Sequence, residues 1–420
     1  MCTNGISKNT SPGHSGGQAL QFGHIKIMKD PNIQDLLDKV EELYFHPRNV
    51  ENLKKWVRQP KRALDNKWRH LPKTADFSKV PVPIVVNMEP SLRSEFFDYS
   101  VKDYFHNPQS YLEYYLKHEI FHFNEIVDDV PLLRHIPVYC TAYFEATLCG
   151  AEIVYLDDHD AILPDKPHMA ELSEVELMPL ADFNRGPSMT YAKKLYEYVL
   201  DQVEGREFTV AFPEWLRNPF GVATWLYGED RLLAAIESDP RGVHRLIRYA
   251  TDCRKKWTGQ RRVFLGEEGY VTAPMYSDSV RDDTMGPDVY QEFVYPYELE
   301  VAELHGGIYY WHSCGDTTKL LESIGRLPIQ VFHVGPWTSA QKAAEVFGLN
   351  GTALEFAVQK HGDYGPTLRP AQDDVFRASP GDIESKLRDI LRHVIAGGVS
   401  ACFVDAGPLH RAAYRGGQTA

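Results

Sequence analysis

The segment GIYYWHSCGDTT, residues 307–318, carries the two side chains whose types and spacing point most clearly to chemistry. Its apolar run predicts a strand that ends at His312, after which Gly315 turns the chain toward a helix. Because residues i and i+2 of a strand point the same way, the imidazole of His312 and the thiol of Cys314 should converge. This donor pair suits zinc, and a catalytic zinc site needs three protein ligands and one open position. The simpler interpretation is a buried cysteine beside a capping histidine.

A third metal ligand must come from another part of the chain, and the last predicted strand, Ser400–Val404, offers two candidates. Cys402 lies in the middle of this strand, where a lone cysteine is more often part of the core than a ligand. Asp405 follows the strand and is better placed for a pocket at its carboxyl end. The residues leave both candidates open.

Three acidic residues are candidate catalytic groups. Glu267 and Glu268 follow an apolar run at Val263–Gly266 that predicts a strand, so one of the two carboxylates should face a pocket and act as a general base or orient a substrate. Asp278 lies in the loop beyond them. The simpler interpretation is that these carboxylates are solvated.

Other polar groups lie within or beside apolar strands, where a titratable side chain is costly unless it is used or paired. His333 is a further catalytic candidate on this ground. Four residues are candidates for binding a substrate: Glu145, Glu355, Tyr310 and Asn87. For Glu145 a structural ion pair is the alternative, and for Tyr310 a place in an aromatic wall.

The elements that must position these residues alternate between short apolar strands and amphipathic helices. The predicted strands are Pro81–Val86, Glu152–Leu156, Phe208–Ala211, Val263–Gly266, Ile308–His312, Gln330–Val334, Ala353–Phe356 and Ser400–Val404. The predicted helices are Pro108–Ile126, Met189–Val203, Glu229–Glu237, Gly242–Trp257, Pro287–His305, Thr317–Ile324, Ala340–Phe347 and Pro380–Ile395. Such alternation indicates a mainly parallel sheet.

Eight strands predict an α/β fold of the (β/α)8 TIM-barrel type, whose active sites gather at the carboxyl ends of the strands. An open doubly wound sheet is the alternative, but no glycine-rich phosphate loop follows the first strand. Residues 1–24 predict a flexible tail, and 25–80 a helical lead-in with apolar residues at helical spacing. The barrel is expected over residues 81–420.

Composition narrows the classes of partner. The net charge of −13, from 45 Lys and Arg against 58 Asp and Glu, argues against nucleic acid. The six cysteines form no CxxC pair, which argues against a disulfide-linked secreted fold. The start of the chain lacks the apolar core of a signal peptide, and no run of 18 apolar residues predicts a membrane span. A cytoplasmic protein is therefore expected.

Residues 312–318, HSCGDTT, resemble the His-x-Cys-Gly-[Asn/Asp]-Thr-Thr element of corrinoid-linked methyltransferases in the uroporphyrinogen decarboxylase superfamily. Other stretches resemble that family in the same order, and together they extend the resemblance over about residues 80–410. They are residues 144–152 (FEATLCGAE), 226–230 with Asp239-Pro240, 266–268 (GEE), 285–297 (MGPDVYQEFVYPY) and 379–398.

This resemblance implies a (β/α)8 barrel with zinc at the centre of its carboxyl face, and it carries His312 and Cys314 over as ligands. It also implies a methyltransferase in which zinc lowers the pKa of a thiol substrate, so that a thiolate takes a methyl group from a corrinoid on a partner protein or from a small methyl donor. This role for zinc is chemically reasonable, because a free thiol is largely protonated at neutral pH and a zinc-bound thiol is a thiolate. A homodimer is a further possibility.

The chain departs from the family pattern at the third ligand. The family has a cysteine in a Pro-Gly-Cys turn, but Asp405 occupies that place here, with Cys402 three residues earlier. A carboxylate ligand would make the zinc less electron-rich. Two other functions stay open: a decarboxylase or lyase of a carboxylated small molecule, and a non-catalytic barrel that binds a tetrapyrrole or corrinoid. The decarboxylase is disfavoured because residues 87–93, NMEPSLR, lack that branch's arginine-rich signature.

Overall fold

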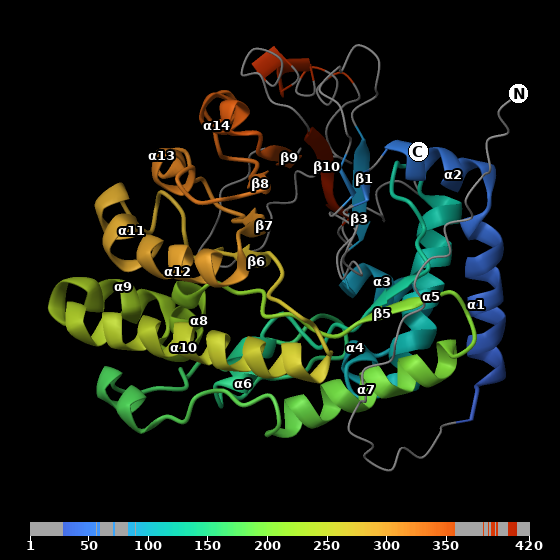
Figure 1. Ribbon diagram of the computed structural model, residues 1–420, viewed down its shortest axis with the longest axis horizontal. Coiled ribbons are helices and arrows are strands. Elements are labelled where there is room, and N and C mark those ends of the chain that lie inside the picture. The colour runs from blue at the N-terminus through green and yellow to red at the C-terminus, as the bar shows by residue number, and fades with distance from the viewer. Residues whose placement is uncertain are drawn as a thin grey trace, which may run out of the picture.

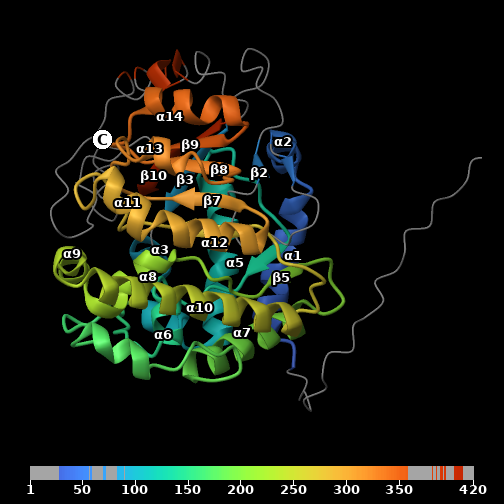
Figure 2. The same cartoon turned by 60° about the vertical axis from the view of Figure 1, so that its left-hand side comes forward.

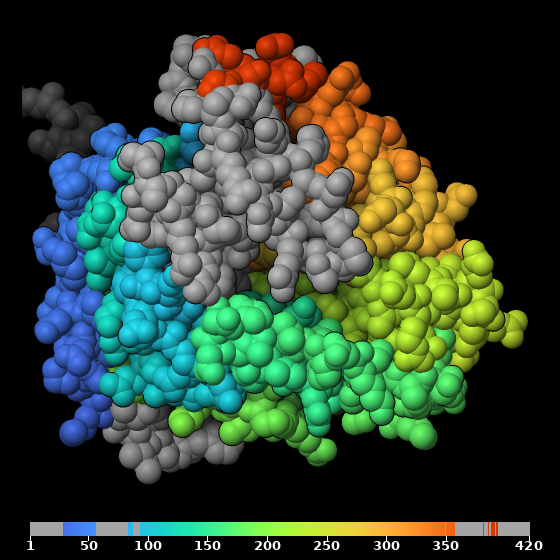
Figure 3. Space-filling model, turned by 180° about the vertical axis from the view of Figure 1, so that it is seen from behind, coloured from blue at the N-terminus to red at the C-terminus, as the bar shows by residue number. Residues whose placement is uncertain are grey.

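The computed structural model of the chain describes residues 28–55, 57–58, 70–71, 83–88, 90–357 and 402–409, with a few helical residues between 381 and 393. The predicted tail, residues 1–24, lies outside the described residues. Two helices, α1 (Pro31–Tyr44) and α2 (Pro47–Lys55), occupy the start of the predicted lead-in. The carboxylate of Asp30 begins α1 by accepting hydrogen bonds from the backbone N–H groups of Asn32 and Ile33. The apolar face of α1 is buried and packs on α5 (Pro108–Glu125), so the N-terminal helices join the body of the barrel (Figure 3).

The strands are short. They are β1 (Val57–Arg58), β2 (His70–Leu71), β3 (Ile84–Met88), β4 (His135–Pro137), β5 (Thr209–Ala211), β6 (Ala273–Tyr276), β7 (Ile308–His312), β8 (Val331–Val334), β9 (Ala353–Ala357) and β10 (Cys402–Leu409). Of these, β4, β6, β7, β8 and β9 are mostly buried. β1 and β2 form a separate antiparallel pair.

Within the described ranges, six strands are ordered β3-β10-β9-β8-β7-β6, and β4 pairs with β5. All of these neighbours run parallel. A bridge between Arg217, beyond β5, and Tyr276 of β6 joins the two groups on one side. On the other side, the backbone N–H of Asp129, ahead of β4, donates to the carbonyl of Ile84 in β3 at 2.9 Å. These contacts bring β3 to β10 round into the predicted (β/α)8 barrel (Figure 1).

Helices cover the outside of the strands, as Figures 1 and 2 show from two directions. They are α3 (Pro90–Phe97), α4 (Val101–Tyr104), α5 (Pro108–Glu125), α6 (Phe144–Leu148), α7 (Pro187–Val203), α8 (Pro219–Tyr227), α9 (Glu229–Ser238), α10 (Pro240–Phe264), α11 (Pro287–Phe293), α12 (Tyr295–His305), α13 (Leu321–Ile324) and α14 (Ala340–Phe347). Among the described residues, no helix is both long enough and apolar enough to cross a bilayer.

Two of the predicted strands are wrong. At Glu152–Leu156 the chain makes only an isolated antiparallel bridge, and the strand in this part of the barrel is β4. At Val263–Gly266 the chain is the end of the 25-residue helix α10, and the strand comes later as β6. A short apolar run cannot be told from the end of a buried helix by its periodicity, and Pro274 weakens the strand pattern of β6. The predicted helix Pro287–His305 is divided at Val294 into α11 and α12.

Candidate metal centre

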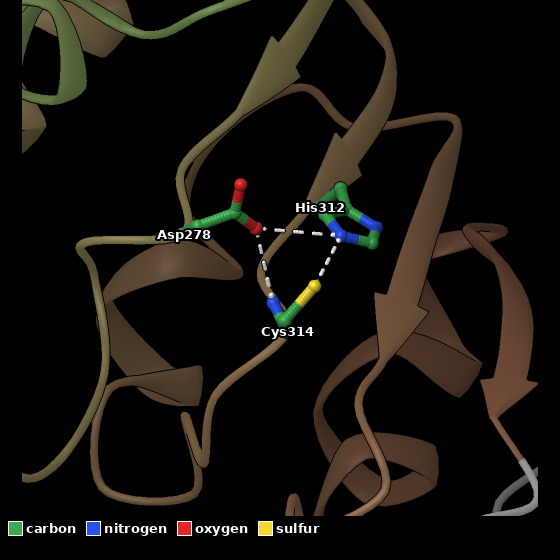
Figure 4. A group of neighbouring side chains, drawn as sticks. All are labelled: Asp278, His312 and Cys314. Atoms are coloured by element: carbon green, nitrogen blue, oxygen red, sulfur yellow. Dashed lines mark hydrogen bonds and ion pairs between the residues drawn. The ribbon is translucent and has the colours of Figure 1, made fainter. Parts of the chain in front are cut away.

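Asp278, His312 and Cys314 converge at the carboxyl ends of β6 and β7 (Figure 4). The Nε2 atom of His312 lies 3.0 Å from the sulfur of Cys314 and 3.4 Å from Oδ1 of Asp278. One ligand atom from each of the three residues lies within 4.8 Å of the other two. The expected convergence of residues 312 and 314 is present, and a carboxylate from the neighbouring strand completes a group of three donors.

Backbone hydrogen bonds set the position of Asp278. The N–H of Ser277 donates to the carbonyl of His312 at 2.7 Å, so the chain beyond β6 stays alongside the end of β7. The next residue is Asp278, and its Oδ1 atom accepts a hydrogen bond from the backbone N–H of Cys314 at 3.2 Å. The parallel pairing of two neighbouring strands therefore brings together residues that are more than 30 positions apart in the chain.

Arg217 neutralises the charge of Asp278. Its guanidinium donates to Oδ2 of Asp278, the oxygen that faces away from the histidine, and its planar group lies 4.2 Å from the ring centre of Trp225. Burial alone would raise the pKa of Asp278, but Arg217 and His312 outweigh it and hold the pKa well below its usual range. Asp278 is therefore an anion with one oxygen directed at the other two donors.

Tyr310 and Glu355 orient the ring of His312 from behind. The hydroxyl of Tyr310 donates to Oε2 of Glu355 at 2.5 Å and lies 3.1 Å from Nδ1 of His312. Because its proton goes to the carboxylate, the phenol oxygen accepts the Nδ1–H of His312. That tautomer leaves the lone pair of Nε2 directed at Cys314 and Asp278, as a metal ligand requires.

His333 packs against the ring of His312 and lies beside Glu355. Its ring centre lies 4.1 Å from that of His312, and its Nδ1 atom lies 3.2 Å from Oε2 of Glu355. Burial lowers the pKa of His312, and the neighbouring His333 lowers it further, while Asp278 and Glu355 oppose the shift. The net lowering favours the neutral imidazole that binds metals.

The donor set fits zinc. Cys314 supplies a thiol whose pKa is raised by burial and by the nearby Asp278, so the thiol keeps its proton until a cation replaces it. A tetrahedral zinc ion would hold such N, S and O ligands about 3.3–3.6 Å apart. The separations of 3.0 and 3.4 Å therefore need a shift of at most about half an ångström.

A cavity of about 210 Å³ lies near this centre, and none of the three donors is among the residues that line it. Tyr276 connects the two, since it lines the cavity and its ring centre lies 5.1 Å from that of His312. Glu145 also lines the cavity, and its Oε1 atom accepts hydrogen bonds from the backbone N–H groups of Leu216 and Arg217. Burial raises the pKa of Glu145 despite these two bonds. The remaining lining is Pro137, Val138, Tyr139, Cys140, Thr141, Phe144, Pro213, Glu214, Leu216 and Tyr309.

The structure places Glu267 and Glu268 away from the centre. Both follow α10 and precede β6, so they lie toward the amino end of that strand, and the expectation that they follow a strand's carboxyl end is wrong. Glu267 pairs with Arg261 at 3.2 Å, and Glu268 is exposed. Tyr310 and Glu355, predicted to bind substrate, lie behind His312, while His333 lies against its ring.

Three predicted residues have only their backbone described. Asn87 lies in β3 and pairs with Pro408 of β10, while Cys402 and Asp405 lie in β10 opposite Leu354 and Ala357 of β9. Cys402 begins β10 and Asp405 lies inside it, four residues before its end at Leu409, so the predicted places in the middle of the strand and after it are wrong. The choice between these two as a metal ligand stays open, because their side chains lie outside the described residues.

Sequence reasoning missed Arg217, which lies 61 residues from its partner Asp278. Nothing in the local pattern marks it, because it follows β5 in a stretch without regular periodicity. Asp278 was predicted as a catalytic residue, and its nearness to His312 and Cys314 was not foreseen.

The fold and this centre define a class of protein: a parallel (β/α)8 barrel with an imidazole, a thiol and a carboxylate at the carboxyl ends of two adjacent strands. The family model described as Uroporphyrinogen decarboxylase (URO-D) matches residues 73–397, and the chain belongs to this family. A solved structure of a methyltransferase from Methanosarcina mazei is similar, with a TM-score of 0.53 and 15% identity, covering 78% of this chain and 88% of that chain. No curated protein matches the sequence. The predicted superfamily is confirmed, and the solved structure supports the fold.

Proposed function

We propose that this chain is a zinc-dependent methyltransferase that moves a methyl group to a thiol. The observation that carries the proposal is the convergence of Asp278, His312 and Cys314. Three protein donors are the number that a catalytic zinc site uses when it keeps a fourth position for substrate. The similarity to a protein named as a methyltransferase supports the reaction type.

Each residue of the centre has a distinct part in this proposal. His312 and Cys314 are ligands, and Asp278 is the third, with Arg217 holding its other oxygen. The Tyr310–Glu355 pair keeps Nε2 of His312 unprotonated. Bound zinc would lower the pKa of a coordinated substrate thiol and so supply a thiolate at neutral pH. Cys402 and Asp405 remain predicted alternatives for the third ligand.

The nearby cavity, which Tyr276 links to His312, is the proposed site for the body of the thiol substrate. Its walls combine aromatic rings, such as those of Tyr139, Tyr276 and Tyr309, with a few polar groups. Such a lining is typical of small-molecule sites, in which apolar walls provide contact and polar groups fix orientation. The methyl donor in this proposal is a corrinoid held by a partner protein or a small methylated molecule.

Metal analysis tests the centre first. We expect one equivalent of zinc in the purified protein and a loss of zinc affinity in His312→Ala and Cys314→Ser. Removing a group that merely orients a ligand costs about 10–100-fold in affinity, so removing a ligand should cost more than about 100-fold. Cys149→Ala, which removes another buried thiol, is the matched control and should retain zinc. A folded wild-type protein that binds no zinc would contradict the proposal.

The third ligand is tested by comparing Asp278→Asn, Cys402→Ser and Asp405→Asn. We expect the largest loss of zinc affinity in the first variant. A larger loss in either of the others would assign the ligand to β10.

The reaction is tested with methylcobalamin and a simple thiol such as 2-mercaptoethanol. Transfer of the methyl group should require zinc and should be lost in Cys314→Ser. Zinc binding without transfer to any thiol would favour the decarboxylase or the non-catalytic barrel.

A further inference from the structure

Glu298, on α12, is a fully buried carboxylate that accepts four side-chain hydrogen bonds. Its Oε1 atom accepts from the amide of Asn218 at 2.9 Å and from the hydroxyl of Ser277 at 2.8 Å. Its Oε2 atom accepts from the hydroxyl of Tyr290 at 2.8 Å and from the indole N–H of Trp311 at 3.3 Å. Every donor is uncharged, and together they satisfy the carboxylate in a place that water does not reach.

Three of these donors are the chain neighbours of residues in the metal centre. Asn218 follows Arg217. Ser277 precedes Asp278, and Trp311 precedes His312. Glu298 is thus bonded to the residue next to each of these three members of the centre, from three different segments of the chain.

The geometry of extended chains explains this relationship. Successive side chains of a strand point to opposite faces, so Trp311 points outward to α12 when His312 points into the barrel. Asn218 and Ser277 are likewise buried on the side of Glu298, while their neighbours Arg217 and Asp278 meet each other at the centre. The carboxylate of Glu298 therefore holds three chain segments on the outer side of the strands. In each segment, the adjacent residue places its side chain at the centre on the inner side.

A buried arginine holds the same segments by their carbonyl groups. Arg254 of α10 donates to the carbonyl of Arg217 at 3.1 Å and to that of Pro274 in β6 at 2.8 Å. Burial lowers the pKa of Arg254 to about 10, and Glu298 is among the acids that oppose this shift. The outer side of these strands thus carries two buried groups whose hydrogen bonds end on the segments of the centre.

We propose that Glu298 is a positioning residue that sets the spacing of Arg217, Asp278 and His312 through their chain neighbours. The role in metal binding rests on the proposed function, whereas the role in placing the ring of His312 does not. Positioning at this range is effective because the neighbours Asn218, Ser277 and Trp311 are themselves buried and cannot readily rearrange.

The test is Glu298→Gln, compared with Tyr290→Phe. The first variant keeps the shape of the side chain but sets an amide NH2 group against the amide of Asn218 or the indole N–H of Trp311, because the hydroxyls of Ser277 and Tyr290 can turn to accept. Either clash lies next to the centre. The second removes one of the four bonds, and Tyr290 on α11 has no chain neighbour in the centre. Both variants should lower the thermal midpoint, so stability alone does not distinguish them.

Two measurements separate positioning from stability. In metal-free protein, the NMR signals of the His312 ring should shift in Glu298→Gln and stay in place in Tyr290→Phe. Zinc affinity should fall about 10–100-fold in the first variant and stay within about twofold in the second, as for groups that orient ligands. If Glu298→Gln does not fold, Ser277→Ala removes one bond beside Asp278 and should show a smaller change of the same kind.

The proposal is overturned if a folded Glu298→Gln, or Ser277→Ala in its place, keeps the wild-type ring signals and zinc affinity. If the wild-type protein binds no zinc, the proposed function fails. The ring signals of the metal-free protein then still decide the role of Glu298.

Discussion

An arginine–carboxylate pair lies beyond each end of β6, and the two pairs differ in their surroundings. At the carboxyl end, Arg217 holds Asp278 next to the imidazole of His312 and the thiol of Cys314. At the amino end, Glu267 meets Arg261, which also donates to two backbone carbonyls. The first carboxylate has its second oxygen directed at soft donors, whereas the second pair only ties a loop to a helix. The neighbours of an ion pair, rather than the pair itself, therefore distinguish a candidate site from a structural contact.

The largest effect is expected from removing the carboxylate of the first pair. Asp278→Ala should lower the free energy of unfolding by about 3 kcal/mol, the low end of the range for a buried ion pair, because it leaves the mostly buried Arg217 without its partner. It should also abolish zinc binding. Urea unfolding and zinc titration measure the two effects, and Asp278→Asn, which keeps the shape but removes the charge, should also lose zinc. A variant of normal stability and zinc affinity would mean that the two pairs are equivalent.

Changes at Tyr310 and Glu355, which orient the ring of His312, should have a smaller effect, and only on zinc affinity. Tyr310→Phe removes the acceptor of the Nδ1–H of His312, and zinc affinity should fall by about 10-fold. Glu355→Gln acts on the same hydrogen-bonded chain, so the effects of the two changes should not add in the double variant. Fully additive losses would show that Tyr310 and Glu355 act independently.

The first pair also predicts a dependence of stability on pH. The pKa of Asp278 is lower in the folded state than in the unfolded state, so the anion stabilises the fold above the unfolded pKa of about 3.9. This contribution is lost as the pH falls toward the folded pKa. In metal-free protein, the difference in unfolding free energy between wild type and Asp278→Asn should therefore be constant above about pH 5 and shrink below about pH 4. A difference that grows on acidification would contradict the assignment.

The sequence predicted the parts of the site that depend on local spacing. His312 and Cys314 are two positions apart in a strand, so the alternation of side chains alone brings them together. The barrel followed from the alternation of strands and helices, and its family from motifs spread along the chain. The predicted strand at Val263–Gly266 is wrong because an apolar run near a helix end looks like a short strand.

The other residues around His312 and Cys314 are brought there by contacts across the barrel, which local sequence patterns do not encode. Arg217 reaches Asp278 only because the chain beyond β5 runs beside β6. Glu298 did leave a signal, since it is an acid within YPYELEVAELH, where most of its neighbours on α12 are apolar. Recognising its role still required the positions of Asn218, Ser277 and Trp311.

The smallest effect is expected from breaking the second pair, Arg261 and Glu267. Glu267→Ala should lower the free energy of unfolding by less than about 1 kcal/mol, because Glu267 is partly exposed and solvent screens its interaction with Arg261. Arg261 also keeps its bonds to the carbonyls of Pro213 at 2.7 Å and Phe212 at 3.0 Å, so its charge is not left without acceptors. Zinc affinity should stay at the wild-type value. If the same titration that detects the loss in Asp278→Ala finds a loss here too, then the amino end of β6 contributes to the site, and the contrast between the two pairs fails.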